Sequence, residues 1–342
     1  MSAVRFHAMP FQILSLSGGG YLGLYTITIL AEFERRVGRP IATCFDLLAG
    51  TSIGGIIALA LAAQTPANEI KASFEQEGRA IFSSRSAPQT KVGELWDFLR
   101  SFLTAKYDDK LLRWTISRIV GGDTLIGQLK HPVVIPAVNL TKGKPQVFKT
   151  DHHPDFQVDH LRSVVDVALA TSAAPTYFPI ATICDELFVD GGLFANAPDL
   201  IALHEAEHFF GKKIEDVFML SVGTTTSKFS FSQSRGLSLG TLAWSRRFSR
   251  VLLASQQLDV GYIVRHRLGE RYLRVDAEQS KEQERDLGLD IASSTAQSTI
   301  RGLASATVQE YLNNPTLQQI LSQRAPDPVF YRRNKSGHGP NE

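Results

Sequence analysis

The sequence of 342 residues has little cysteine and almost no net charge. With only Cys44 and Cys184 there is no disulfide framework, and because both stand in apolar runs we predict two buried thiols in a reducing compartment. The 36 basic and 34 acidic side chains leave a formal charge of +2, so no overall field attracts nucleic acid, and nucleic acid is not an expected partner. An anionic partner must therefore be bound locally.

A long apolar segment is also missing. The longest apolar run, 53–63, is about half of what a bilayer span needs. The first residues, "MSAVRFHAMP", lack the charged, apolar and small-residue order of a signal peptide. With 43% hydrophobic residues the chain has an ordinary globular composition, and we expect a soluble, cytoplasmic protein that is able to touch a membrane surface.

Two apolar segments that end in glycines are each followed by a helical pattern. "FQILSLS" precedes Gly18 and a helix over 22–37, and "CFDLLAG" (44–50) precedes a helix over 53–63. Strand, turn and helix in repetition predict an α/β domain with a largely parallel sheet. Further strand candidates are "PVVIPAVNL", "PQVFKT", "ELFVDGG" and "VFMLSVGT", so we expect the sheet to end near residue 224.

The remaining segments read mainly as helix. Residues 11–224 are predicted to form the main α/β core, with 66–130 as a helical cap or insert. In "KVGELWDFLRSFL" (91–103) apolar residues share one helical face, which either packs on the core or acts as a lid or membrane contact. Residues 225–320 are expected to be a mainly helical part packed on the core, and 327–342 a solvated tail.

The stretch "ILSLSGGGYLGLY" (13–25) fits two kinds of anion site. Gly18, Gly20 and Gly23 have the G-x-G-x-x-G spacing of a dinucleotide site, but such a turn can equally hold an oxyanion. A nucleotide site needs an acidic residue at the end of the next strand. Asp46 has the right separation but stands at the start of its strand. The oxyanion interpretation is therefore favoured.

The second turn, "GTSIGG" (50–55), supplies the chemistry that an oxyanion site requires. Gly50, Ser52 and Gly54 fit G-x-S-x-G between an apolar strand and a small-residue helix. That context is typical of a nucleophile elbow, in which flanking glycines leave room for a strained serine. Ser52 is therefore the predicted nucleophile.

A serine nucleophile needs a base. None of the nine histidines stands on a late loop after an acid, and His204 and His208, in a predicted helix, are weak alternatives. Asp190 in "FVDGGLFANAP" follows a strand, and Gly191 and Gly192 would let the backbone turn sharply. The same pattern fits a plain turn, but beside an elbow without a histidine Asp190 is the leading candidate.

The cluster "TDHHPDFQVDH" (150–160) raises the alternative of a metal site. Adjacent His152 and His153 would point apart on an extended segment, whereas a metal needs convergent ligands. A polar loop is the favoured interpretation, and no metal is expected.

Four segments, in order, resemble the patatin-like phospholipase family: "SGGGYLG" (17–23), "GTSIGG", "ATSAAPTYFP" (170–179) and "DGG" at Asp190. The resemblance implies a three-layer α/β sandwich with a mostly parallel central sheet and helices on both faces. It implies Ser52 as nucleophile, Asp190 as general base and the amides of Gly18, Gly19 and Gly20 as an oxyanion hole, acting on membrane phospholipid without a required cofactor. Where the family commonly has arginine or lysine, this chain has Leu22.

The length of the chain and the segment "GERYLRVD" are similar to a bacterial subgroup of this family. In that subgroup a cyclic dinucleotide made during phage infection activates degradation of the cell's own phospholipids, which implies an enzyme acting at the inner membrane. Residues 225–320 would then carry regulation or the contacts of a homo-oligomer. Two alternatives stay open: a constitutive lipase without nucleotide control, and a non-catalytic protein with this fold.

The segment "WSRRFSR" is the candidate site for a phosphate-bearing regulator or an anionic headgroup. Arg246, Arg247 and Arg250 stand close together on a predicted helix. The competing interpretation is an ordinary solvated helix face.

Overall fold

The computed structural model describes residues 9–82, 105–225 and 241–332, with side chains omitted at 241–247, 249 and 250. An eight-stranded sheet forms the centre of the described chain, with the order β5-β6-β3-β2-β1-β7-β8 and β4 paired to β3. Its strands are β1 (Phe11–Leu16), β2 (Leu47–Gly50), β3 (Val133–Asn139), β4 (Lys144–Lys149), β5 (Ala181–Ile183), β6 (Glu186–Asp190), β7 (Val217–Val222) and β8 (Tyr272–Val275).

The middle of the sheet is parallel. β1 lies between β2 and β7, both parallel to it, and β3 and β8 extend the parallel set on either side. β4, β5 and β6 add antiparallel pairs at one edge. The turns that follow β1, β2 and β7 therefore meet at one end of the sheet, where ligands of open α/β sheets bind.

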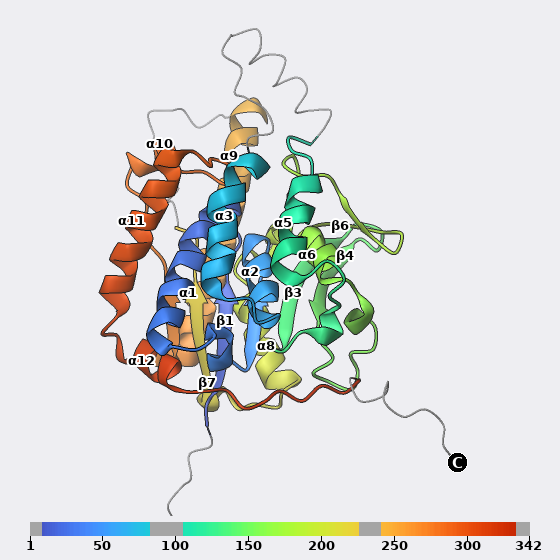
Figure 1. The fold of residues 1–342 in the computed structure, drawn as a ribbon, viewed down its shortest axis with the longest axis vertical. Coiled ribbons are helices and arrows are strands. Elements are labelled where there is room, and N and C mark those ends of the chain that lie inside the picture. The colour runs from blue at the N-terminus through green and yellow to red at the C-terminus, as the bar shows by residue number, and fades with distance from the viewer. Residues whose placement is uncertain (1–8, 83–104, 226–240, 333–342) are drawn as a thin grey trace, which may run out of the picture.

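Helices cover both faces of the sheet. Along β1, Leu14 and Leu16 pack into one core and Phe11 and Ile13 into the other, because successive strand residues point to opposite faces. Figure 1 shows helices in front of and behind the sheet, so the predicted three-layer arrangement is confirmed. One layer contains α1 (Gly23–Val37), α2 (Ile53–Ala62), α3 (Ala67–Phe82), α5 (Lys110–Val120), α6 (Val164–Ser172), α11 (Ser294–Tyr311) and α12 (Pro315–Ser322), and the other contains α8 (Asp199–His208) and α9 (Thr241–Leu268).

The strand pattern predicts that the sheet ends near residue 224, but in the structure a further strand, β8, continues it. β8 pairs in parallel with β7, from Met219 opposite Tyr272 to Val222 opposite Val275. The strand is only four residues long and contains Arg274. A short run with a charged residue, between helical segments, gives too weak an alternation to predict.

The prediction of two buried thiols is wrong for one of them. Cys44 is buried, but Cys184 is exposed. Cys184 and Asp185 have φ of 46° and 64° and form the two-residue turn between β5 and β6. Tight hairpin turns of this kind stand at the surface, which overrides the apolar neighbours of Cys184.

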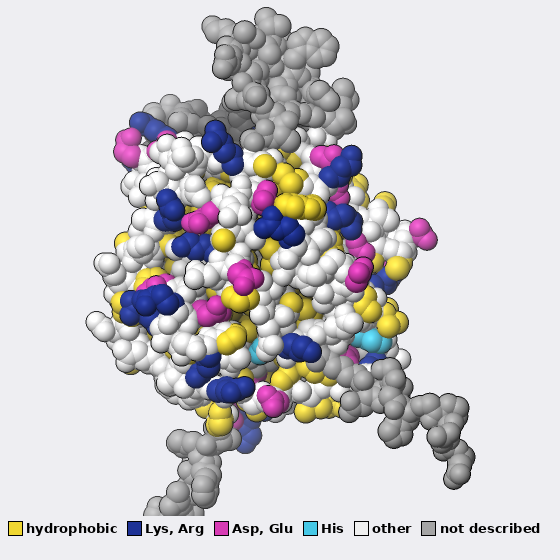
Figure 2. Space-filling view, in the orientation of Figure 1, with side chains coloured by type: hydrophobic (Ala, Val, Ile, Leu, Met, Phe, Trp, Pro, Cys, Tyr) yellow, Lys and Arg dark blue, Asp and Glu magenta, His cyan; other side chains and the backbone are white. Residues whose placement is uncertain are grey.

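Charged side chains of both signs are interspersed over the face that carries α1, α3 and α11 (Figure 2). This distribution agrees with the formal charge of +2. No helix in the described part of the chain is long and apolar enough to cross a bilayer. The amphipathic segment 91–103 lies outside the described residues.

The last described residues cross the base of the molecule in Figure 1. We call residues 323–332 the C-terminal strap; it contains neither helix nor strand. The amide of Ala325 donates to the Thr43 carbonyl at 2.9 Å, and the amide of Tyr331 donates to the Asp151 carbonyl at 3.0 Å. The strap thereby ties the end of the chain to segments before β2 and after β4.

Candidate active site

Ser52, the predicted nucleophile, stands in the turn between β2 and α2. Its φ of 55° and ψ of −125° lie outside the regions that L-residues normally adopt. The turn is tight, since a Cβ added to Gly54 would collide with the Leu16 carbonyl. The glycine therefore permits contact between two backbones, and the serine is held in a strained conformation at the start of a helix.

Asp190 is the last residue of β6, with 6% of its surface exposed. Its Oδ1 accepts a hydrogen bond from the Gly192 amide at 2.6 Å. Burial raises the pKa of Asp190 to about 6, although hydrogen bonds from the Ser52 side chain and the Gly192 amide act in the opposite direction. The structure thus brings the two predicted site residues into contact, although 138 positions separate them in the sequence.

The glycines after Asp190 do not make the sharp turn expected of them. Gly191 has a helical φ of −63°, and the helix α7 (Gly192–Ala195) begins at once. A Cβ at Gly191 would collide with the Pro136 carbonyl. The glycine is therefore needed for space beside β3 rather than for an unusual backbone conformation.

The three glycines after β1 are not equivalent. The Gly18 amide donates to the Asn196 carbonyl at 2.9 Å, so in this conformation it is not available to an oxyanion. Within the described residues no acceptor is found for the amides of Gly19 and Gly20, both of which are partly exposed. The expected set of three donors is thereby reduced to two.

Thr171, in the segment 170–179, connects the serine turn to the aspartate. Its Oγ1 accepts from the Ser52 amide at 3.0 Å and donates to the Pro136 carbonyl at 2.6 Å. Its carbonyl accepts from the Gly191 amide at 3.3 Å. Sequence reasoning identified the segment but gave this threonine no role, because its partners come from three distant parts of the chain.

A buried cation lies beneath the glycine loop. The Arg274 guanidinium donates to Ser17 Oγ at 2.9 Å and to Ser221 Oγ at 2.8 Å, and it pairs with Asp276 at 2.8 Å. Arg274 stands on β8, in the segment "GERYLRVD". Because Ser17 directly precedes Gly18, this charge network helps to fix the position of the loop.

A pocket of about 330 Å³ opens beside the glycine loop. Gly18 and Gly19 line one side, together with Leu22, which is only 6% exposed. The opposite side comes from α9 and from residues 284–291. In place of the family's basic residue, Leu22 therefore adds apolar surface to this pocket.

Residues 284–291 also cover the glycine loop directly. The Leu289 carbonyl accepts from the Tyr21 amide at 2.8 Å. Asp290 accepts from the Tyr107 hydroxyl at 2.9 Å and forms an ion pair with Lys106. A segment of the C-terminal third thus forms one wall of the site.

The other candidates from the sequence lie elsewhere. Asp46 precedes β2 and accepts from the Gln12 amide at 2.7 Å, at the opposite end of the sheet from the glycine loop. His152 Nε2 contacts Glu205 at 3.0 Å and its Nδ1 contacts Thr150 at 2.7 Å. Among the described residues, no group of three or more potential ligands could hold a metal ion.

Arg246, Arg247 and Arg250 belong to the helix α9. Their side chains lie outside the part of the chain that the structure describes. The regulator site assigned to them stays a prediction.

Comparison with known proteins identifies relatives along almost the whole chain. A model of the family described as "Patatin-like phospholipase" matches residues 14–203. A protein of Pseudomonas aeruginosa named "cGAMP-activated phospholipase" is 42% identical, with 97% of this chain and 96% of the relative covered. Proteins of the same name from Vibrio cholerae and Escherichia coli are 39% and 36% identical, with 91% and 92% of this chain and 94% of each relative covered.

Proposed function

The chain belongs to the patatin-like phospholipase family, and we propose that it hydrolyses ester bonds of membrane phospholipids with Ser52 as nucleophile and Asp190 as general base. One observation carries the assignment of the two residues. A buried carboxylate with a pKa of about 6 contacts a serine held in a left-handed turn at the start of a helix. A base titrating near neutral pH beside a strained hydroxyl is suited to acyl transfer.

In the first step Asp190 takes the proton of Ser52 while the serine oxygen attacks the ester carbonyl. The negative charge that develops on the carbonyl oxygen is held by the amides of Gly19 and Gly20. The start of α2, directly after Ser52, favours negative charge at the same place. A single backbone donor of this kind is worth roughly 3 kcal/mol in acyl transfer.

In the second step the tetrahedral intermediate collapses and expels the lysolipid oxygen, which takes the proton from Asp190. The acyl group is now bonded to Ser52. Asp190 next removes a proton from a water molecule, whose oxygen attacks the acyl carbonyl. When this second tetrahedral intermediate collapses, the bond to Ser52 breaks, the serine oxygen takes the proton back from Asp190 and the fatty acid is released. The aspartate and the serine end in their starting states, so the sequence needs no further group.

We propose in addition that cGAMP activates the enzyme. The proposal is supported by three relatives named "cGAMP-activated phospholipase", which are 36–42% identical over more than nine-tenths of this chain. The active enzyme would work peripherally at the inner membrane, where its phospholipid substrate is found. Assembly into a homo-oligomer stays a prediction.

Hydrolysis of a fluorogenic phospholipid, measured with and without cGAMP, tests reaction and regulation together. We expect strong stimulation by cGAMP in the original protein and no hydrolysis after Ser52→Ala. Ser322→Ala, at the end of α12, is the control and should behave like the original. Equal rates with and without cGAMP would identify a constitutive lipase, and hydrolysis by Ser52→Ala would remove Ser52 from the mechanism.

A fluorophosphonate probe separates an enzyme from a non-catalytic protein with this fold. Such probes label only an activated serine, so we expect labelling of the original protein and none of Ser52→Ala. An original protein that resists the probe both with and without cGAMP would contradict the catalytic proposal.

A further inference from the structure

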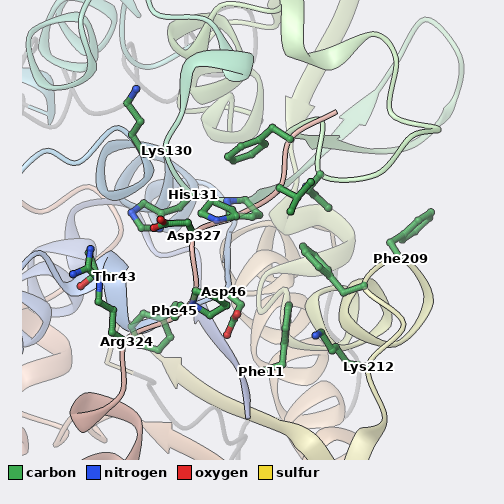
Figure 3. Close-up of a pocket in the computed structure, with 18 of the residues that line it drawn as sticks. Phe11, Thr43, Phe45, Asp46, Lys130, His131, Phe209, Lys212, Arg324 and Asp327 are labelled. Carbon is green, nitrogen blue, oxygen red and sulfur yellow. The ribbon is translucent and has the colours of Figure 1, made fainter. Parts of the chain in front are cut away.

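A second pocket, of about 520 Å³, lies at the end of the sheet opposite Ser52 (Figure 3). Three of its residues stand where strands begin: Phe11 opens β1, Asp46 precedes β2 and His131 precedes β3. The C-terminal strap, from Arg324 to Tyr331, forms another wall. We call this the basal pocket.

We propose that the basal pocket is the site at which a cyclic dinucleotide binds and controls the enzyme. The inference rests on the proposed regulation and adds a location to it. Its support is the side-chain chemistry of the pocket, its size and the strands that it shares with the catalytic turns.

Aromatic rings, on which purine bases can stack, line the basal pocket. Phe209 and Phe210 are partly exposed and Tyr331 is exposed, whereas Phe45 and Phe11 are buried, and Phe11 packs on Phe210 with ring centroids 4.8 Å apart. The Lys212 ammonium lies 5.5 Å from the centroid of the Phe11 ring. Figure 3 shows the two side chains next to each other. The exposed cation of Lys212 therefore lines the same pocket as the partly exposed rings of Phe209 and Phe210, which suits a base joined to a phosphodiester.

Two cations of the pocket can serve phosphates. Lys212 and Arg324 are exposed, and no ion pair to either is found among the described residues. Phosphodiester groups bind most strongly to such charge-assisted donors. Asp327, also exposed in the lining, can accept hydrogen bonds from the exocyclic amino groups of purines.

His131 offers a polar contact inside the pocket. It is only 7% exposed, and its Nε2 has no hydrogen-bond partner among the described residues. Burial lowers the pKa of His131 to about 4, so the ring is neutral at pH 7. A neutral buried ring suits the edge of a base or a ribose hydroxyl better than it suits a phosphate.

The pocket is also large enough for its ligand. Small-molecule sites typically enclose about 300 to 1,000 Å³, and the basal pocket falls within that range. It is larger than the pocket beside the glycine loop, at about 330 Å³.

The basal pocket and the catalytic turns share two strands. β1 runs from Phe11 to the glycine loop, and β2 runs from the segment of Asp46 to the turn of Ser52. A ligand that shifts the starts of these strands acts on the elements that carry the oxyanion donors and the nucleophile. A bound ligand would also contact the strap. The first residue of the strap, Gln323, accepts a hydrogen bond from Arg39 through its carbonyl.

A third pocket, between α1, α3 and α11, provides the comparison. It contains Lys71, Arg35 and Arg36, but both arginines already contact Glu32, at 2.7 and 2.8 Å. None of its lining residues is aromatic. It offers charge without a stacking surface, and Lys71 is therefore the matched control position.

The test is isothermal titration of cGAMP into the full chain carrying Ser52→Ala. We expect the double substitution Lys212→Glu and Arg324→Glu to weaken binding at least tenfold, and Lys71→Glu to leave it within twofold. His131→Phe, which keeps an aromatic ring without the free nitrogen, should weaken binding severalfold. Fluorophosphonate labelling of the same variants on the Ser52 background, without nucleotide, should match the original protein.

The outcomes separate this inference from the proposed regulation. Binding that is unchanged in the double variant, or lost equally in Lys71→Glu, overturns the basal pocket as the site while the regulation stands. No detectable binding to the original protein overturns the regulation, and the inference with it.

A second measurement on the original protein covers the case of a variant that fails to fold. With cGAMP bound, amide hydrogen exchange should slow in residues 323–332 and around His131, and not in α1 beside Lys71. Protection confined to α1 and α3 would place the ligand in the third pocket and contradict the proposal.

Discussion

The two ends of the sheet are built by different means. At the catalytic end, backbone groups lie so close together that a Cβ at Gly54 or Gly191 would collide with a carbonyl oxygen. At the opposite end, the basal pocket is lined by exposed cations, aromatic rings and an irregular strap. The glycines of the first end tolerate almost no change of residue, whereas the exposed residues of the second, such as Lys212 and Arg324, can be altered without disturbing the core.

The two ends also differ in the burial of charged groups. At the catalytic end a charged group is buried, since Asp190 is 6% exposed and its pKa is raised to about 6. That burial favours catalysis and opposes stability. Substitution of Asp190 should therefore produce large effects of opposite sign on activity and stability, and substitutions of exposed residues at the basal end should produce small effects on stability and on labelling of Ser52 without nucleotide.

Asp190→Asn gives the largest expected effect. Loss of the base should lower ester hydrolysis by about 10³- to 10⁴-fold, measured as kcat/KM on a soluble ester. The amide keeps the shape of the side chain, so the glycine loop should stay in place. Residual activity above one-tenth of the original would contradict the role of Asp190.

The same substitution should stabilise the fold. In the folded protein Asp190 has a pKa of about 6 against an ordinary 3.8, so folding strengthens its hold on a proton. Stability contributed by the protonated form is therefore lost as pH rises from about 4 to about 6, and at pH 7 the buried charge costs up to about 3 kcal/mol. Urea unfolding at pH 7 should show a higher free energy for Asp190→Asn. A lower one would mean that the carboxylate is stabilising.

Arg274→Met comes next in size. Removing the guanidinium leaves Asp276, whose side chain is 13% exposed, without its ion-pair partner, which should cost about 3 kcal/mol of unfolding free energy. Because the guanidinium also donates a hydrogen bond to Ser17, kcat should fall while KM changes little. Arg267→Met, which breaks an exposed pair with Glu207, is the matched control and should cost at most about 1 kcal/mol. Equal losses in the two variants would contradict the special role of the buried pair.

The pH dependence of hydrolysis should reflect the buried base. Asp190 must be ionised to take the serine proton, so the rate should rise with pH and level off above about 6. Between pH 7 and pH 5 we expect a loss of about tenfold with a neutral soluble ester, corresponding to titration of one group. A rate that stays constant over this interval would show that the catalytic group is not the buried carboxylate.

The sequence predicted the strand, turn and helix around Ser52 because their pattern is local. Gly54 and Ser52 stand two positions apart, and the strand, turn and helix around them leave a pattern of spacing. Asp190 is favoured over a histidine because none of the histidines stands on a late loop after an acid, and the family resemblance implies the same choice. The role of Gly18 was not predictable, since its amide is engaged by Asn196, a residue 178 positions away.

The strand β8 and the basal pocket carry no such pattern. β8 is four residues long, and Arg274 breaks its apolar alternation. The basal pocket combines Phe11, His131 and Lys212 with the strap, so only the folded chain brings its residues together. Such sites consist of side chains from segments that are far apart in the sequence. No fixed spacing between these residues marks the site in a single sequence.

Arg332→Ala should give the smallest effect and tests whether the two ends are independent before a ligand binds. The side chain donates to the Phe156 carbonyl at 3.2 Å and to the Pro154 carbonyl at 3.1 Å, and losing both partly exposed bonds should cost about 1 kcal/mol. The amide of residue 332 can still donate to Asp151, which keeps the strap attached. Fluorophosphonate labelling of Ser52 without nucleotide should therefore be unchanged, whereas a loosened strap should weaken cGAMP binding severalfold. A parallel fall in labelling would mean that the strap supports the catalytic turns even without a ligand, and the contrast between the two ends would no longer hold.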